Sequence, residues 1–392
     1  MAVTMRYRTR LLVLLLSAPI LAFAVLGGYL GRTFAQEDSY RPLRIFEDVV
    51  SLILNSYVED VDVDLVMAGA MRGLSGGLDA DSAYLTPGDV AALESGDALP
   101  EGRTGVTLTR QFYLRVLSAR DGSPAAEAGL RPGDYIRGID GESTRSMSIF
   151  EGTQRLRGAI GSAVTLTVIR GNATEPQEIA LTRARLTAAS ITARLAAPAV
   201  GYVRVAAFDA GVADEIRDTV GSLEEAGAQA LVVDLRGTAD GSNADGVDAA
   251  RLFVGTGTLA IRQRRDESQE TTVAESGDGD IDLPTVLLIG NGTSGAAELF
   301  ASALADNARA ELIGGRTFGR AAEQRLIKLP DGSGLWLSWA QYLTAGGEQL
   351  HQQGLEPAII IPTPSVEMGA EPPDDDPALD RAIERLSTDQ AA

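Results

Sequence analysis

Apolar side chains recur at helical spacing from residue 41 to residue 92, and this pattern predicts helices. Thr86-Pro87 has the composition of a helix start and begins a further short helix. We therefore expect an N-terminal helical segment at 41–98.

At about Gly102 the pattern changes to short stretches in which apolar and polar residues alternate, as in strands. Ser123-Pro124 begins a one-turn helix, and Pro132-Gly133 marks a tight turn. The chain from 99 to 185 therefore reads as a mainly-β domain. Strands are predicted at 106–108, 114–117, 164–170 and 178–182, with a helix at 148–156.

Residues 186–364 alternate between strand and helix patterns, which is typical of an α/β layered core with a largely parallel sheet. The predicted strands are at 202–205, 230–234 and 286–289, and the predicted helices at 212–225, 245–253 and 296–307. Functional loops of such sheets follow the carboxyl ends of the strands, here at 236–241 and 291–295. Residues 365–392 form an acidic tail with a short helix at 377–386.

The first residues of the chain predict export. Arg6, Arg8 and Arg10 precede an uncharged apolar run at 11–31, which is long enough to span a bilayer. The end of the segment at 1–35 also resembles a signal-peptide cleavage site, although the length of the run favours an uncleaved anchor. We expect the rest of the chain on the periplasmic side of a bacterial inner membrane, either anchored or secreted.

Composition removes several classes of function. The 34 basic and 54 acidic residues give a net charge of -20, so no nucleic-acid partner is expected. The chain has no cysteine, and His351 is its only histidine, which excludes Cys nucleophiles and Cys/His metal sites. The acidic loop at 278–282 lacks the calcium-binding EF-hand pattern. We expect neither a metal nor a cofactor.

The order of turns and strands around Gly122–Leu130, Arg131-Pro132-Gly133-Asp134 and Ile136–Gly141 resembles a PDZ domain. The resemblance implies that a peptide adds as a strand and that backbone N–H groups hold its C-terminal carboxylate. The peptide-binding residues are then Arg103, Thr104, Gly105, Val106 and Leu108, with Gly105 allowing close approach of the backbone. The alternative is that Arg103 is a solvated turn residue and Gly105 an ordinary turn glycine.

Several further segments carry a second resemblance, among them Leu78–Leu85, Asp234-Leu235-Arg236, Gly314–Gly319, Leu329–Gly332 and Gly354–Pro357. Together with the PDZ-like domain, they make the chain after residue 40 resemble the C-terminal processing peptidases, the S41 serine peptidases. The resemblance implies a Ser-Lys dyad, in which a neutral lysine deprotonates a serine. The lysine follows a Phe-Gly pair, and the serine lies in a Gly/Ser/Ala-rich stretch that ends in Glu.

On these motifs, the nucleophile position holds Gly295 and the base position holds Arg320. Glycine has no nucleophile, and arginine keeps its proton near neutral pH. In the loop that the resemblance assigns to the oxyanion hole, Asp240 replaces a glycine before Gly241, and a carboxylate there repels a developing oxyanion. We expect Arg320 to form an ion pair with Glu323 or Asp240.

Outside the dyad positions, other residues are weaker candidates for catalysis. Ser294 is a fallback nucleophile next to the usual position, and Lys328 is the only lysine. Lys328 follows Arg320 by eight residues, which is ~25 Å along an extended strand. His351 with Glu348 or Glu356 could imitate a triad.

The sequence thus predicts a pseudopeptidase that holds polypeptide C-termini or unfolded protein segments in its PDZ domain. One alternative is an active serine peptidase with a non-standard dyad. The other is a structural partner of active relatives that assembles through the helices at 41–92. A homo-oligomer and a hetero-oligomer both remain open.

Overall fold

The computed structural model describes residues 41–95, 99–186, 191–364, 366–370, 373 and 375–389. The predicted anchor at 1–35 lies outside these residues. Within the described ranges, no helix is both long and apolar enough to cross a membrane. The chain divides into two compact units, Met1–Ala70 and Met71–Ala392.

The first unit is helical where it is described, as the apolar periodicity predicts. Residues 41–56 form a helix, and α2 (Val63–Gly76) begins in this unit. Apolar side chains along both helices are exposed, among them Leu52 at 65% and Leu65 at 67%.

The helical prediction is wrong at residues 83–85. Ala83–Leu85 forms the strand β1, which pairs antiparallel with β16 (Gly334–Leu343). The helix α3 (Pro87–Glu94) follows, capped by the Thr86 side chain. A three-residue strand has no periodicity of its own, and its partner lies some 250 residues away along the chain.

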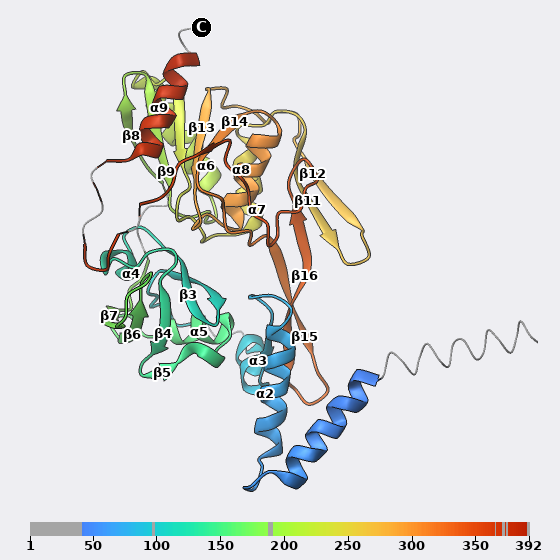
Figure 1. The fold of residues 1–392 in the computed structure, drawn as a ribbon. Coiled ribbons are helices and arrows are strands. Elements are labelled where there is room, and N and C mark those ends of the chain that lie inside the picture. The colour runs from blue at the N-terminus through green and yellow to red at the C-terminus, as the bar shows by residue number, and fades with distance from the viewer. Residues whose placement is uncertain are drawn as a thin grey trace, which may run out of the picture. The chain divides into compact units, whose positions relative to one another are not determined.

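The PDZ-like domain is a sheet with the strand order β2-β3-β4-β6-β7, drawn in green shades in Figure 1. Its elements are β2 (Val106–Gln111), β3 (Tyr113–Ala119), α4 (Pro124–Glu127), β4 (Tyr135–Ile139), β5 (Glu142–Ser143), α5 (Ile149–Leu156), β6 (Ala163–Ile169) and β7 (Gln177–Thr182). Among the described strands, β2 pairs with β3 alone, so its other edge has no strand partner. Strand addition by a peptide needs such an edge.

The helix α5 lies close to β2 because Gly152 has no side chain. A Cβ at this position would come within 2.3 Å of Leu114 Cδ1 and 3.0 Å of Leu108 Cδ1. Leu108 is 2% exposed and belongs to the core of the domain. The sequence therefore sets the width of the groove between α5 and β2.

The α/β core confirms the predicted parallel sheet, with the strand order β17-β14-β13-β10-β9-β8. The strands are β8 (Ile191–Ala197), β9 (Val200–Val205), β10 (Ala230–Asp234), β13 (Thr285–Ile289), β14 (Ala310–Gly314) and β17 (Ile359–Ile360). Neighbouring strands from β9 to β17 pair parallel, whereas β8 pairs antiparallel with β9.

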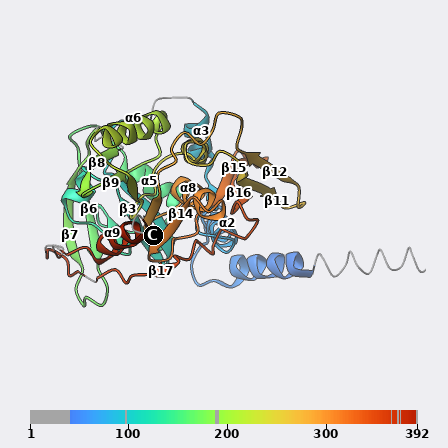
Figure 2. The same cartoon turned by 90° about the horizontal axis from the view of Figure 1, so that it is seen from above.

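Helices cover both faces of this sheet, as Figure 1 and Figure 2 show. The helices α6 (Val212–Glu225), α7 (Asn243–Arg251) and α8 (Ala296–Asp306) pack on the side chains of one face, which include Leu231 and Val233. The helix α9 (Pro377–Asp389) packs on the other face, against Val232 and Val286. Alternate residues of β10 thus enter two different cores, as expected for a strand buried on both sides.

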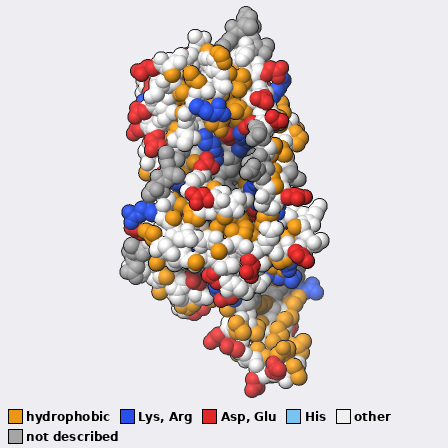
Figure 3. Space-filling view, turned by 90° about the vertical axis from the view of Figure 1, so that its left-hand side faces the viewer, with side chains coloured by type: hydrophobic (Ala, Val, Ile, Leu, Met, Phe, Trp, Pro, Cys, Tyr) orange, Lys and Arg blue, Asp and Glu red, His pale blue; other side chains and the backbone are white. Residues whose placement is uncertain are grey.

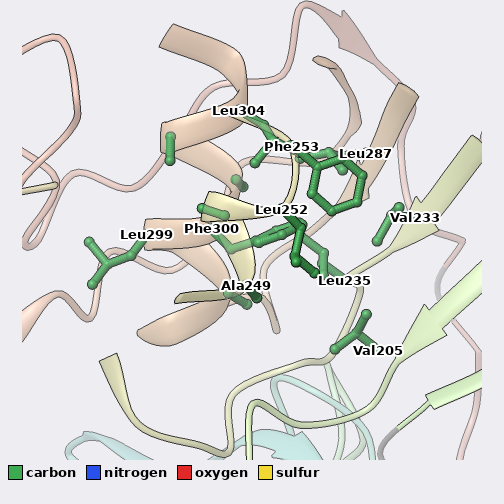
Figure 4. Packing of buried hydrophobic residues seen from close by; sticks show 14 of the residues in the cluster. Val205, Val233, Leu235, Ala249, Leu252, Phe253, Leu287, Leu299, Phe300 and Leu304 are labelled. Atoms are coloured by element: carbon green, nitrogen blue, oxygen red, sulfur yellow. The ribbon is translucent and has the colours of Figure 1, made fainter. Parts of the chain in front are cut away.

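Three phenylalanines form the centre of the larger core, and Figure 4 shows two of them, Phe253 and Phe300. The ring of Phe300 lies 5.4 Å from that of Phe208 and 5.6 Å from that of Phe253. Phe300 belongs to α8, so this packing fixes the helix that begins at Gly295. Truncation of a buried phenylalanine typically costs about 3–5 kcal/mol.

A second sheet, which the sequence did not predict, has the order β1-β16-β11-β12 with β15 also paired to β16. Its further strands are β11 (Thr258–Arg264), β12 (Gln269–Val273) and β15 (Ala322–Lys328). The strand β15 begins two residues after Arg320, so this sheet positions the predicted base residue.

On the face seen in Figure 3, acidic side chains are spread among apolar and uncharged ones, consistent with the net charge of -20.

Gly105 provides a test of the PDZ-like fold, because its backbone has φ +82° and a Cβ there would lie 2.1 Å from Ser123 Cβ. We predict that Gly105→Ala lowers the free energy of unfolding by about 3 kcal/mol, of which about 1 kcal/mol is backbone strain and the rest overlap. Gly161 is a matched control, since it has φ +84° and no atom within 4 Å of the added Cβ. Urea unfolding that gives equal losses for Gly105→Ala and Gly161→Ala would contradict this packing.

Candidate active-site cleft

Two loops that the sequence singles out meet at one edge of the parallel sheet. The strands β10 and β13 are neighbours, with Asp234 in register with Leu288, so both loops leave the same edge. The Ser294 N–H donates to the Thr238 carbonyl oxygen at 3.0 Å and ties the two loops together. The expected position of functional loops at the carboxyl ends of the strands is therefore observed.

Gly295, at the predicted nucleophile position, immediately precedes α8 with φ +61° and ψ -120°. Its positive φ favours glycine over residues with a side chain. Space is not the obstacle, because a Cβ there would lie 3.7 Å from the Arg320 carbonyl oxygen and 3.8 Å from Asn243 Oδ1. The position thus has room for a side chain and a backbone suited to glycine.

Arg320, at the predicted base position, forms an ion pair with Asp81, with 2.6 Å between Nη2 and Oδ1. Its Nη1 also donates to the Leu108 carbonyl oxygen of β2 at 3.3 Å. The expected ion pair of Arg320 with Glu323 or Asp240 is therefore wrong. Asp81 lies just before β1, and the pairing of β1 with β16 brings it to the site. Nothing in the local sequence around Arg320 indicates this partner.

Glu323, one of the two partners expected for Arg320, forms its ion pair with another arginine. Glu323 pairs with Arg262 at 2.9 Å and accepts a hydrogen bond from the Tyr342 hydroxyl group at 2.7 Å. This bond and burial raise the pKa of Tyr342 well above its ordinary value, with burial the larger cause. Glu323 is therefore part of the second sheet and not of the cleft.

The carboxylate of Glu298 is fully buried beneath the two dyad positions. Its Oε2 accepts the N–H groups of Gly295 at 3.0 Å and Arg320 at 2.9 Å. Its Oε1 accepts the Gly319 N–H at 2.6 Å and the Thr317 hydroxyl group. Burial raises the pKa of Glu298, whereas these four hydrogen bonds oppose the shift. One side chain thereby holds both loops by their backbone.

Asp240 does not present a bare carboxylate to the cleft. Its Oδ2 lies 3.1 Å from Arg103 Nη2 and 3.2 Å from Arg120 Nη1, and both arginines belong to the PDZ-like domain. Arg120 is also paired with Asp209 at 2.6 Å. The expectation that Asp240 repels an oxyanion is weakened accordingly, because two guanidinium groups compensate its charge.

Gly241, the other predicted residue of the oxyanion loop, has φ +123°. A Cβ there would lie 2.3 Å from the Phe208 carbonyl oxygen, with which this loop forms a β-bridge. The close approach of the backbone at Phe208 therefore requires a glycine at position 241.

The predicted peptide-binding residues lie together at the start of β2. Arg103 points to Asp240, and Thr104 and Gly105 are buried. Within the part of the chain that the structure describes, the N–H groups of Thr104 and Gly105 have no hydrogen-bond acceptor. The overlap of a Cβ at residue 105 with Ser123 gives Gly105 a packing role as well. Val106 is half-buried, and Leu108 is in the domain core.

One cleft of about 360 Å³ joins the groove of the PDZ-like domain to the dyad positions. Eight of the predicted residues line it: Arg103, Val106, Leu108, Asp240, Gly241, Ser294, Gly295 and Arg320. Thr104 and Gly105 are not among its lining residues. Asn243 and Arg157 also line it, and the sequence interpretation missed both because they lie outside the motifs that carry the resemblance.

The fallback catalytic residues are not assembled. Ser294 is 1% exposed, and its Oγ has no hydrogen-bond partner among the described residues, so no base is bound to it. Lys328 forms an ion pair with Glu94 at the far end of β15. Burial lowers the pKa of His351, which the charges of Asp79 and Asp81 oppose. Glu356 instead pairs with Arg316 at 3.2 Å.

A parallel α/β core whose loops converge on a cleft beside a PDZ-like domain is the architecture of a PDZ-containing peptidase. A model of peptidase family S41 matches residues 199–361, and a PDZ-domain model matches residues 115–170. The chain is 32% identical over 281 residues to a carboxyl-terminal-processing protease of Picosynechococcus sp., a match that covers 71% of this chain and 68% of that protein. The chain therefore belongs to the carboxyl-terminal processing proteases of peptidase family S41.

Other relatives agree with this assignment. A carboxyl-terminal-processing protease of Synechocystis sp. is 35% identical over 257 residues, which is 64% of this chain and 60% of that protein, less than two thirds of its length. The solved structure of the photosystem II D1 C-terminal processing protease matches with a TM-score of 0.68 at 29% identity. This match covers 80% of the present chain and 85% of that chain. The predicted fold class and family are thus confirmed.

The four hydrogen bonds of Glu298 predict a large effect of Glu298→Gln. A glutamine amide has one oxygen and an NH2 group, so some of the buried N–H donors lose their acceptor. We expect the free energy of unfolding in urea to fall by about 3 kcal/mol. The control Glu215→Gln, on the exposed face of α6, should change it by less than about 0.5 kcal/mol. Similar losses for the two variants would contradict the stabilising role of the hydrogen bonds that Glu298 accepts.

Proposed function

We propose that the chain is a catalytically inactive member of its family that binds polypeptide C-termini or extended segments in the cleft. The observation that carries the proposal is the pair of residues at the dyad positions. Gly295 offers no hydroxyl group, and the Arg320 guanidinium is held in its ion pair with Asp81. A Ser-Lys dyad needs a hydroxyl nucleophile and a neutral amine, and arginine supplies no such base near neutral pH.

The surroundings support the same proposal. The hydroxyl group of Ser294, the residue before Gly295, is buried, and no described residue is hydrogen-bonded to it. Catalysis by an activated serine needs a base within hydrogen-bond reach of the hydroxyl group. An active peptidase with a non-standard dyad is therefore the weaker alternative.

Peptide binding is supported by the shape of the PDZ-like domain. The edge of β2 is open, and the cleft beside it includes Val106, Leu108 and Ile149 as apolar lining residues. A peptide strand that adds to β2 can place an apolar side chain against them. The binding partner in this proposal is a polypeptide C-terminus or an unfolded segment.

The proposed location follows from the apolar run at 11–31, which would hold the chain on the periplasmic side of a bacterial inner membrane. Exposed apolar side chains on the helices at 41–56 and 63–76 favour a second candidate function. In that alternative, these helices assemble with another copy or with an active relative, and the cleft stays empty.

We predict no turnover by the full chain purified in detergent, measured with fluorescently labelled denatured casein. The single variants Gly295→Ser and Arg320→Lys should also be inactive, because the members of a catalytic unit do not act alone. Cleavage by the unaltered chain that disappears in Ser294→Ala would contradict the proposal. Cleavage that persists in Ser294→Ala would indicate a contaminating protease, which a repeat after further purification removes.

A further inference from the structure

The cleft contains an imbalance of charge. Three arginines line it, Arg103, Arg157 and Arg320, whereas Asp240 is its only acidic lining residue among those described. Arg103 is paired with Asp240, and Arg320 is paired with Asp81 from outside the lining. The side chain of Arg157 forms no hydrogen bond and no ion pair with any described residue.

The backbone places Arg157 next to the loop at the start of β2. Gly102 and Gly158 form an isolated β-bridge, in which each N–H donates to the other carbonyl oxygen at 3.0 Å. Arg157 precedes Gly158 and follows the last residue of α5, whereas Arg103 and Thr104 follow Gly102. Arg157 therefore lies at the end of the groove where the unpartnered N–H groups of Thr104 and Gly105 are found.

The environment of Arg157 disfavours an unpaired charge. Burial lowers its pKa, the positive charge of Arg103 lowers it further, and Asp240 opposes both. A partly desolvated guanidinium group without a partner is costly, and a carboxylate that forms two parallel hydrogen bonds with it relieves that cost. Asp240 is already held by Arg103 and Arg120, so the described lining of the cleft offers no further carboxylate to Arg157.

We propose that Arg157 is the carboxylate-binding residue of this cleft, and that the bound peptide supplies the carboxylate. The inference rests on the proposed function and assigns to Arg157 a role that the sequence suggested for the Arg103 loop. The carboxylate belongs either to the C-terminus of the peptide or to an Asp or Glu side chain. Both forms present the same chemistry to a guanidinium group.

The test measures binding of three peptides to the full chain in detergent by fluorescence anisotropy. The first is fluorescein-Gly-Ser-Thr-Val-Thr-Val as the free acid, and the second is the same peptide with a C-terminal amide. The third is the amide with Asp in place of the second Thr. The protein variants are Arg157→Gln, Arg157→Lys and, as a control, Arg145→Gln, which alters an exposed arginine elsewhere on the same domain.

We expect the unaltered chain to bind the free acid at least about 10-fold more tightly than the amide, and Arg157→Gln to abolish this difference. Arg157→Lys should keep part of it, and Arg145→Gln should keep all of it. If the Asp-containing amide binds as tightly as the free acid and depends on Arg157, the carboxylate is that of a side chain. If Arg157→Gln unfolds thermally at the same temperature as the unaltered chain, any loss of binding is local and not a loss of folding.

Two results would overturn the inference, and they differ. If the unaltered chain binds the peptides and Arg157→Gln retains both the affinity and the preference for the acid, Arg157 is not the carboxylate-binding residue, although the proposed peptide binding stands. If the unaltered chain binds none of the three peptides, the proposed peptide binding fails together with the inference.

Discussion

The buried carboxylate of Glu298 holds the cleft together, because the backbone N–H groups at both dyad positions donate hydrogen bonds to it. Gly295 and Arg320 each donate their N–H to Oε2, and Gly319 donates to Oε1. These bonds do not involve the side chains at 295 and 320. The two side chains that a Ser-Lys dyad needs can therefore be exchanged while the loops keep their positions. A fold of this kind can lose its chemistry without losing its cleft.

Charge compensation has a comparable role around the cleft. Arg320 is paired with Asp81, and Asp240 is paired with Arg103 and Arg120. Such pairs offset the desolvation cost of the partly buried charges around the cleft. The ion pairs also join separate parts of the second unit: the residues before β1, the PDZ-like domain and the α/β core. The bond from Arg320 to the Leu108 carbonyl oxygen adds a direct link between the dyad position and the open strand β2.

The sequence predicted the parallel core closely, because its strands and helices carry strong local patterns. The helix at 212–225 and the strand at 230–234 have the predicted bounds, since one is amphipathic and the other is apolar throughout. The second sheet was missed, because its strands alternate weakly and pair across long stretches of chain. Motif positions indicated Gly295 and Arg320, whereas the partner of Arg320 and the exposure of Arg157 to the cleft depend on contacts between distant segments.

The proposal that the cleft binds peptides and leaves them intact can be tested on a single bound peptide. The most direct measurement is the mass of a peptide recovered from the bound fraction after long incubation with the full chain. We expect the free-acid peptide to be retained by the protein and to be recovered at its full mass. Recovery of a truncated peptide, in an amount that grows with incubation time and with protein concentration, would contradict it.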